Sequence, residues 1–572
     1  MILAVKNYPL YETTVFEDFR IMMVNVAKKY PEKEALIFRR NPADEVPEFR
    51  TYPQVLDEVR DFGTALTELG CRDQKCAIIG GGTLGWIYSY FALMSIGAVT
   101  VPLDREWPAE DLIAVINRAE CQFVFYSGDI REKADAIRSS CPTVKTLVCM
   151  WEKGAEGDPT MEELMAHGHE LYEGGDNSFF EYQIDPDRLA SIVFTSGTTG
   201  KGKGVMLSQT NIVSDMTQGM YNFAITPKTL CVLPLHHTFG STVNLVGHFS
   251  QGSTLYLSSG VRYIAKEMVE QQPTHLILVP LFIEKLYKKI WSTARKQKLE
   301  KPLKALMFLS NTLRKVGIDA RRKMFASILK MFGGKVEMII CGGAALSQEM
   351  IDTFDAIGIT LLNGYGITEC APLVTCNRNK LQKRGSVGLP IIGEELKIID
   401  PDENGEGEIA VKGPNVMLGY YQDPEATAAV FDEDGFFKTG DYGRLDEDGW
   451  LYITGRLKNL IILSNGKNVY PEEIEFAISS SIQGVEEVVV YAGESKSDAS
   501  KEVIVAEIFP DEEALKEMGV EDVQKYFSEQ VSKLNRKMPP YKTVGLVKIR
   551  STEFVKNTSR KITRFNIDKS IE

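Results

Sequence analysis

The 572-residue sequence lacks several features that would place it outside the cell or in a membrane. Its nine cysteines are scattered and include no CxxC pair. The N-terminus, MILAVKNYPL, has no basic stretch followed by a long apolar run, as a secretory leader would. These absences predict reduced thiols in a cytoplasmic protein.

An excess of positive charge is also absent, since the formal net charge is −13. Such a chain has no overall field that would attract DNA, RNA or an anionic membrane, so local groups must hold any anionic ligand. Nucleic acid is therefore not an expected partner, whereas a peripheral membrane contact is left open.

Only one apolar stretch is long enough to raise the question of a membrane span, WIYSYFALMSIGAVTVPL at 86–103. It contains Ser89, Ser95 and Gly97 and changes character midway, which favours a buried helix followed by a buried strand. No transmembrane segment is expected.

The rest of the chain alternates between helical and strand patterns, which favours an α/β fold with largely parallel sheets. Residues 384–455 are rich in Gly, Asp and Pro between short β-type runs, and predict a small β-rich subdomain. From 456 to 572 the βαβ type of pattern returns. We therefore expect an N-terminal domain at 1–455 and a separate C-terminal domain at 456–572.

The segment SIVFTSGTTGKGKGVMLSQTNI, at 191–212, combines a strand, a glycine-rich loop and a second strand. Glycines let a backbone approach phosphate closely, while hydroxyls and lysines supply donors and charge. A mobile surface hairpin would also explain glycine and threonine, but it needs fewer donors. The sequence thus predicts a polyphosphate loop that includes Thr195, Ser196, Gly197, Thr198, Thr199, Gly200 and Lys203.

Two other nucleotide-binding motifs compete with this interpretation. Residues 197–203 spell GxxxxGK, but Gly204 replaces the hydroxyl residue of a P-loop and a strand follows where a helix is required. GGGTLG, from Gly80 to Gly85, follows a strand and has Asp104 at the end of the next one, so an NAD-dependent oxidoreductase stays an alternative. A tight turn between strand and helix is the preferred interpretation of GGGTLG.

Further motifs follow in an order that makes the chain resemble the adenylate-forming superfamily of acyl-CoA synthetases, aryl-CoA ligases, luciferases and peptide-synthetase adenylation domains. They are TSGTTGKGKG, LPLHHTFG, CGGAAL, NGYGITE, KTGDYGRL, GRLKNLIILSNGKNVYPEEIE and VKNTSRKITR. The resemblance implies a large N-terminal domain of two α/β sheet subdomains plus a small β-barrel-like one. It also implies a small, mobile C-terminal α/β domain.

The resemblance also assigns a nucleotide site for ATP and magnesium. Tyr365, between glycines, is placed against adenine, while Glu369 beside Thr368 is an oxygen ligand of the kind that magnesium takes. Asp441 is assigned to the two ribose hydroxyls, and Arg456 to the ribose or a phosphate. The same resemblance adds Gly343, Ala344, Asn363 and Gly364 to the nucleotide site, and Thr198 to the metal.

For catalysis, the resemblance places His237 near the carboxylate that is activated and gives the catalytic charge to Lys561. Lys458 is the hinge position, and Gly466 lies in a loop that approaches the acceptor thiol. Gly202, Arg560 and Val555 depart from the usual proline, glycine and proline of their motifs, which bears on loop stiffness.

The expected reaction is formation of an acyl-AMP with release of pyrophosphate, followed by transfer of the acyl group to CoA. Members of this superfamily that activate amino acids have an aspartate in the segment occupied here by LPLHHTFG, and it holds the substrate amine. This sequence has no aspartate there and ends at Glu572 without a carrier domain, so an amino acid is not the expected substrate. Residues 309–346 look like the matching region of bacterial long-chain fatty acyl-CoA synthetases, so a fatty acid is the expected substrate. Aryl acids, medium-chain acids and transfer to an acyl carrier protein remain alternatives.

Overall fold

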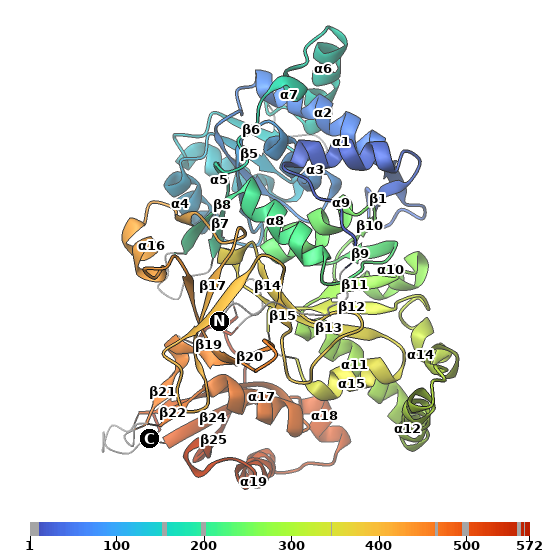
Figure 1. Ribbon diagram of the computed structural model, residues 1–572, viewed down its shortest axis with the longest axis vertical. Helices are drawn as coiled ribbons and strands as arrows, with labels where there is room; N and C mark the ends of the chain where they lie inside the picture. The colour runs from blue at the N-terminus through green and yellow to red at the C-terminus, as the bar shows by residue number, and fades with distance from the viewer. Residues whose placement is uncertain are drawn as a thin grey trace.

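The computed structural model describes residues 11–150, 157–195, 202–344, 346–463, 467–494, 503–556, 562–564 and 567–571. Two large sheets flanked by helices form the upper and middle parts of the molecule, and smaller sheets lie below them (Figure 1). The expected α/β class is confirmed.

The first large sheet has seven strands in the order β18-β8-β7-β4-β3-β5-β6. Its central strands are parallel, while β8 and β18 run antiparallel to their neighbours. The strands are β3 (Lys75–Ile79), β4 (Val99–Leu103), β5 (Phe123–Tyr126), β6 (Thr146–Cys149), β7 (Leu189–Thr195), β8 (Lys203–Ser208) and β18 (Gly419–Tyr420).

The second large sheet has nine strands in the order β15-β14-β13-β12-β11-β9-β10-β1-β2. The run from β13 to β1 is parallel, so the carboxyl ends of these strands share one edge. The strands are β1 (Glu34–Phe38), β2 (Glu48–Thr51), β9 (Lys228–Cys231), β10 (Thr254–Leu257), β11 (His275–Leu278), β12 (Met338–Cys341), β13 (Thr360–Gly366), β14 (Leu373–Cys376) and β15 (Leu389–Pro390).

Helices cover the faces of both sheets (Figure 1). The first group is α1 (Phe19–Lys29), α2 (Tyr52–Glu68), α3 (Leu84–Ser95), α4 (Ala109–Ala119), α5 (Arg131–Ser140), α6 (Met161–Glu173), α7 (Ser178–Glu181) and α8 (Gln209–Met220). The second is α9 (His248–Ser250), α10 (Ile264–Gln271), α11 (Pro280–Lys296), α12 (Glu300–Lys315), α13 (Arg321–Met324), α14 (Ala326–Lys330), α15 (Gln348–Ala356) and α16 (Pro424–Val430).

The long apolar stretch forms a buried helix and then a buried strand, as predicted. Every residue of α3 and β4 is buried, and the Thr83 side chain caps α3 by accepting a hydrogen bond from Trp86 N. Gly97 makes the turn between them with a φ of +78°, where a Cβ would lie 2.5 Å from the Tyr182 ring. In the described part of the chain, no helix is long and apolar enough to cross a membrane.

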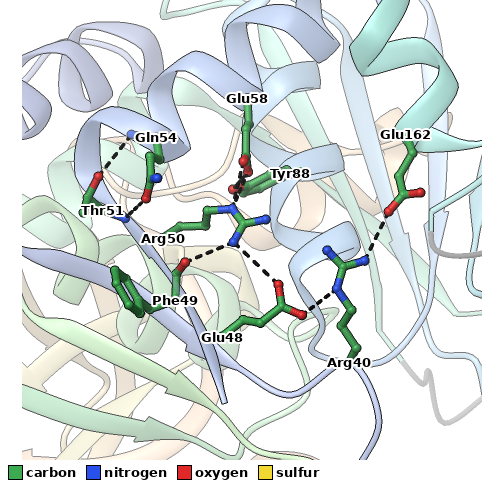
Figure 2. Close-up of polar contacts among 9 residues, drawn as sticks. All are labelled: Arg40, Glu48, Phe49, Arg50, Thr51, Gln54, Glu58, Tyr88 and Glu162. Carbon is green, nitrogen blue, oxygen red and sulfur yellow. Dashed lines mark hydrogen bonds and ion pairs between the residues drawn. The ribbon is translucent and has the colours of Figure 1, made fainter. Parts of the chain in front are cut away.

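A polar network holds the corner where β2 runs into α2 (Figure 2). Thr51 and Gln54 form a capping box, in which the Thr51 amide donates to Gln54 Oε1 at 2.8 Å. Arg50 Nε lies 2.8 Å from Glu58 Oε1, and the buried Tyr88 hydroxyl donates to the same carboxylate. These contacts fix α2 against β2 and α3.

Beside β14 and β15 of the second large sheet, four antiparallel strands in the order β16-β17-β19-β20 lie where the sequence predicts a β-rich region (Figure 1). They are β16 (Glu395–Ile399), β17 (Gly407–Lys412), β19 (Phe437–Leu445) and β20 (Leu451–Arg456). The chain then enters β21 (Ile461–Ile462), β22 (Asn468–Val469), β23 (Val485–Gly493), β24 (Val503–Pro510) and β25 (Leu546–Ile549), with α17 (Pro471–Ser481), α18 (Glu512–Glu517) and α19 (Val523–Asn535).

The C-terminal elements have a core of their own, which includes Val469, Ile474, Val490, Ile508 and Phe527. The domain boundary at 455 stays a prediction.

One side chain of α11 contacts these C-terminal elements directly. Lys288 Nζ lies 2.9 Å from Glu486 on β23 and 3.6 Å from Asp511, the residue that caps α18. We refer to this pair of contacts as the Lys288 clasp.

Candidate active site

The neighbouring strands β12 and β13 bring two predicted segments together at their carboxyl ends. Cys341 of β12 pairs in register with Asn363 of β13, so Gly343 and Ala344 follow β12 beside the end of β13. Gly343 has a φ of +92°, a conformation that favours glycine. The two strands thus form a backbone-rich edge at which a planar ligand could be held.

Asn363 places an unused acceptor at this edge. Its side chain is 8% exposed, and its Oδ1 has no hydrogen-bond partner among the described residues. A buried amide oxygen without a partner costs free energy unless a ligand or water supplies a donor. Gly364, which follows it, has no room for a larger residue without a shift, since a Cβ would lie 3.2 Å from the Thr375 carbonyl oxygen.

Tyr365, Asp441 and Arg456 converge from separate parts of the chain. The Tyr365 hydroxyl donates to Asp441 Oδ2 at 2.7 Å, and Arg456 Nε lies 2.9 Å from Asp441 Oδ1. Asp441 and Arg456 are cross-strand partners on β19 and β20. Asp441 is 3% exposed, and burial together with its charge raises the pKa of Tyr365.

Both oxygens of Asp441 are therefore engaged by protein groups. A ribose that binds this carboxylate must displace or share the Tyr365 and Arg456 contacts. This occupation of Asp441 is a feature that the motif alone does not reveal.

A second charged cluster joins Glu369 to Lys203 through Tyr420. Glu369 lies in a short 3₁₀ turn, Thr368–Cys370, directly after the end of β13. The Tyr420 hydroxyl donates to Glu369 Oε1 at 2.9 Å, and Lys203 Nζ lies 4.2 Å from the centre of the Tyr420 ring. The pKa of Tyr420 is raised, chiefly by burial and then by Glu369.

The ends of the predicted phosphate loop are held by the β7–β8 hairpin. Thr195 pairs with Lys203, and its hydroxyl donates to the Lys203 carbonyl oxygen at 3.4 Å. Arg118, at the end of α4, donates to the Gly202 carbonyl oxygen at 2.6 Å. The loop residues Ser196, Gly197, Thr198, Thr199 and Gly200 lie outside the described residues, as do Gly466 and Lys561.

His237 lies in a turn that precedes an unusual helix, η2 (Phe239–Gly247), which is a π-helix. Its carbonyl oxygen accepts from the Gly240 and Ser241 amides, each at 2.9 Å. π-helical turns occur frequently at functional sites.

The neighbouring His236 has a largely buried ring, with 11% of its side chain exposed. Its Nε2 lies 3.4 Å from Asp104 Oδ2, and the two imidazole rings are 4.2 Å apart. Burial and then the His237 ring lower the pKa of His236 to about 3, against the opposing effect of Asp104. His236 is therefore neutral at physiological pH.

Lys458 follows β20 in the 3₁₀ turn Leu457–Asn459. Desolvation and then the Arg456 guanidinium lower the pKa of its ammonium group. The predicted hinge position thus lies two residues beyond Arg456, at the end of the last strand of the four-stranded sheet.

The alternative dinucleotide motif has a packing explanation. A Cβ at Gly80 would lie 2.6 Å from the Met150 side chain, and one at Gly85 would lie 2.6 Å from the Met150 carbonyl oxygen. Asp104 is 4% exposed and faces His236. Glycine is therefore needed at both positions because Met150 packs closely against the segment between β3 and α3.

Sequence reasoning missed Tyr420 and Arg118. Neither lies in a glycine-rich or charged motif that would draw attention to it. Tyr420 enters the site because β18 pairs with β8 across more than 200 residues of sequence, with Tyr420 opposite Val205.

Comparison with known proteins identifies families whose models match this chain. The model of the AMP-binding enzyme family matches residues 24–421, and that of the AMP-binding enzyme C-terminal domain matches residues 458–567. The chain is 32% identical over 504 residues to long-chain-fatty-acid–CoA ligase 5 of Rattus norvegicus, which covers 81% of this chain and 71% of the rat protein.

A plant relative is named for a different acceptor. The chain is 29% identical over 541 residues to long-chain-fatty-acid–[acyl-carrier-protein] ligase AEE15 of Arabidopsis thaliana, covering 81% of this chain and 73% of the plant protein. The solved structure of o-succinylbenzoate CoA synthetase from Bacillus subtilis, with its acyl-adenylate intermediate, matches the fold with a TM-score of 0.71. That match has 22% identity and covers 96% of this chain and 98% of the other.

Proposed function

Because this chain belongs to the family of AMP-binding enzymes, we propose that it activates a fatty acid as its acyl-AMP and passes the acyl group to CoA. The resemblance of the motifs to adenylate-forming enzymes is confirmed, and the chain is an AMP-forming acid–thiol ligase that binds ATP. The fatty acid and CoA are supported by the names of the relatives.

The observation that carries the proposal is the convergence of two charged clusters at the end of β13. One is Tyr365 with Asp441 and Arg456, which suits the adenosine part of ATP, and the other is Glu369 with Lys203, joined through Tyr420. The free Asn363 Oδ1 would accept a hydrogen bond from the adenine amino group.

One carboxylate at Glu369 fits a magnesium ion that takes its other ligands from ATP phosphates and water. Among the described residues no cluster of three His, Cys, Asp or Glu side chains forms a protein-only metal cage. The resemblance assigns Thr198 as a second ligand, and an ion held at Glu369 would neutralise charge on the phosphates. Glu369 would hold that ion and Lys203 would face the phosphate loop.

The first half-reaction is attack of a carboxylate oxygen on the α-phosphorus of ATP in line with the leaving pyrophosphate. Positioning and charge stabilisation supply most of the catalysis for such a step. His237 would orient the acid beside the η2 helix, and Lys561 would approach the carboxylate and the α-phosphate.

The second half-reaction requires Lys561 to leave so that the thiol reaches the acyl-AMP carbonyl carbon. Rotation of residues 456–572 about Lys458 would remove it and bring the loop with Gly466 to the thiol. An acyl carrier protein is the second candidate acceptor, because one relative is named for it. Aryl and medium-chain acids are further alternatives for the substrate.

Exchange of radioactive pyrophosphate into ATP tests the first half-reaction. We expect exchange that requires both magnesium and a carboxylic acid, strongest with fatty acids in a panel that includes aryl and medium-chain acids. If no acid in the panel supports exchange and the protein binds NAD, the oxidoreductase alternative would be favoured.

Glu369→Gln removes one negative charge with little change of shape. We expect exchange to fall about a hundredfold or more, with a much smaller change in ATP affinity measured by calorimetry. Glu447→Gln is the matched control, since Glu447 lies in an exposed turn of the four-stranded sheet. Equal losses of exchange and ATP affinity would assign Glu369 a structural role instead.

A further inference from the structure

The net charge of −13 conceals a strongly basic segment. Residues 285–335 contain fifteen Lys and Arg but only two Asp and Glu, so the remainder of the chain carries a formal charge of −26. This segment comprises most of α11, all of α12, α13 and α14, the turns between them and the residues that follow α14. We call it the basic shoulder; Figure 1 shows α12 and α14 at the edge of the molecule.

The exposed face of α12 combines lysines with an aromatic side chain. Its inner face packs on the core through Leu303, Met307 and Ser310. Phe308 points outward with 76% of its surface exposed, at helical spacing from Lys301, Lys304 and Lys315.

Further apolar side chains are exposed on the helix and just beyond its end. Val316 is 70% exposed and Ile318 is 54% exposed, and Leu309 on the helix is 49% exposed. Large apolar side chains that are exposed close together mark contact sites with membranes or with other proteins.

Most of the positive charge on the basic shoulder is not neutralised by the protein. Lys304 pairs with Glu300 at 2.8 Å, Arg314 and Arg321 pair with Asp355, and Lys288 forms the clasp. The exposed basic residues that have no acidic partner within the described ranges are Lys285, Lys289, Arg295, Lys296, Lys298, Lys301, Lys315, Lys323, Lys330 and Lys335.

We propose that the basic shoulder docks the protein on an anionic lipid bilayer, with Phe308, Val316 and Ile318 entering the headgroup region. Lysines near a negatively charged leaflet attract it additively, and aromatic and aliphatic side chains anchor at the boundary between headgroups and acyl chains. The proposal is independent of the reaction and assigns a surface that the active site does not use.

Two observations favour a bilayer over other anionic partners. Nine of the ten unpaired basic residues are lysines, which protein–protein interfaces disfavour relative to arginine. A nucleic acid would use the lysines through its phosphates and could stack a base on Phe308, but it offers no apolar phase to the exposed aliphatic side chains of Val316 and Ile318. A bilayer accommodates both features.

Co-sedimentation of the full chain with vesicles tests the proposal. We expect binding to phosphatidylcholine vesicles that contain phosphatidylglycerol, weaker binding to pure phosphatidylcholine, and a loss of binding as salt is raised. Lys301→Glu with Lys315→Glu should weaken binding to the anionic vesicles about thirtyfold or more. Phe308→Ser alone should weaken it about tenfold.

Matched controls use residues on other surfaces. Lys525→Glu with Lys533→Glu makes the same change of charge on the exposed face of α19, and Val46→Ser removes an apolar side chain that is 78% exposed. Both controls should bind vesicles as the unaltered protein does, and thermal unfolding should confirm that all variants fold.

Three results would overturn the proposal. The first is no binding to anionic vesicles, and the second is equal losses in the shoulder variants and their controls. The third is binding of an acidic carrier protein or of RNA through Lys301 and Lys315 while vesicles do not bind. That result would reassign the surface to the partner that binds.

Discussion

Tyr420 connects the carboxylate of Glu369 with the ammonium group of Lys203, two groups that lie far apart in the sequence. We expect Tyr420→Phe to lower acid-dependent pyrophosphate exchange about tenfold. The charged carboxylate of Glu369 loses the hydrogen bond that the Tyr420 hydroxyl donates, while the ring that faces Lys203 is retained. Exchange measured over a range of magnesium concentrations should show an increased requirement for the ion.

Tyr421 supplies the control for this variant. Its hydroxyl contacts Lys75 at 2.8 Å, away from Glu369. Tyr421→Phe should leave exchange unchanged, and a similar loss in both variants would mean that the tyrosines act only through stability.

Glu394 makes the stability of the fold fall as the pH rises from about 4.5 to about 8. It is 9% exposed, neither carboxylate oxygen has a hydrogen-bond partner in the described part of the chain, and burial raises its pKa to about 8. A pKa raised in the folded state gives stability at low pH that is lost as the pH rises through 8. The free energy of unfolding should fall by about 1 kcal/mol between pH 7 and pH 9.

Buried histidines act in the opposite direction. Burial lowers the pKa of His248 to about 4, so the unfolded state binds its proton first and stability falls as the pH drops from about 6.5 toward 4. Urea unfolding from pH 4 to pH 9 should show that Glu394→Gln removes the fall in stability between about pH 4.5 and pH 8, so that the gain from neutral His248 is no longer offset below pH 6.5. An unchanged loss of stability between pH 7 and pH 9 in this variant would contradict the assignment.

At the scale of an element, the η2 helix depends on one glycine. A Cβ at Gly240 would lie 2.1 Å from the Pro234 carbonyl oxygen, which belongs to the turn that carries His237. We expect Gly240→Ala to displace this turn and to cost about 2 kcal/mol or more of unfolding free energy, measured by urea denaturation.

Gly82→Ala is the control for Gly240→Ala because it lies close to the same turn. A Cβ there would be 3.6 Å from Leu235 Cγ, an ordinary contact distance. Its stability should stay within about 0.5 kcal/mol of the unaltered protein, and equal losses in the two variants would show that crowding at Pro234 is unimportant.

Elements with a strong local pattern could be predicted from the sequence. The serines and the glycine in 86–103 correctly separate α3 from β4, and the alternation of patterns correctly gives an α/β fold. The two strands around the phosphate loop were also predicted, and the structure confirms β7 and β8.

Contacts between distant segments could not be predicted in the same way. Tyr420 reaches Glu369 only because β18 adds to the edge of the seven-stranded sheet beside β8. Nothing in the local residues encodes that pairing. For the same reason, the motif TGD gives the position of Asp441 but not that Tyr365 and Arg456 already engage both of its oxygens.

At the scale of the whole molecule, the two half-reactions should depend on different residues. We expect Lys561→Ala to reduce acyl-AMP formation by a factor of about a hundred or more, because a positioned charge at the transition state is lost. Thioester formation from supplied acyl-AMP should persist. Lys458→Pro should retain adenylation but slow transfer to CoA, because a fixed φ hinders rotation.

Single-turnover assays of each half-reaction would separate these effects, with circular dichroism to confirm folding. Proportional loss of both steps in both variants would leave domain rotation without support. Lys561 and Lys458 would then have to be withdrawn from the site.

The Lys288 clasp has a consequence for the enzyme at rest. Its groups are partly exposed, so each contact contributes at most about 1 kcal/mol and weakens as salt is added. If residues 456–572 rotate as proposed, an energy of that size would change the ratio of the two arrangements by about fivefold, which favours one of them without fixing it. Added salt would then shift the balance between the two proposed arrangements away from the one in which Lys288 contacts Glu486 and Asp511.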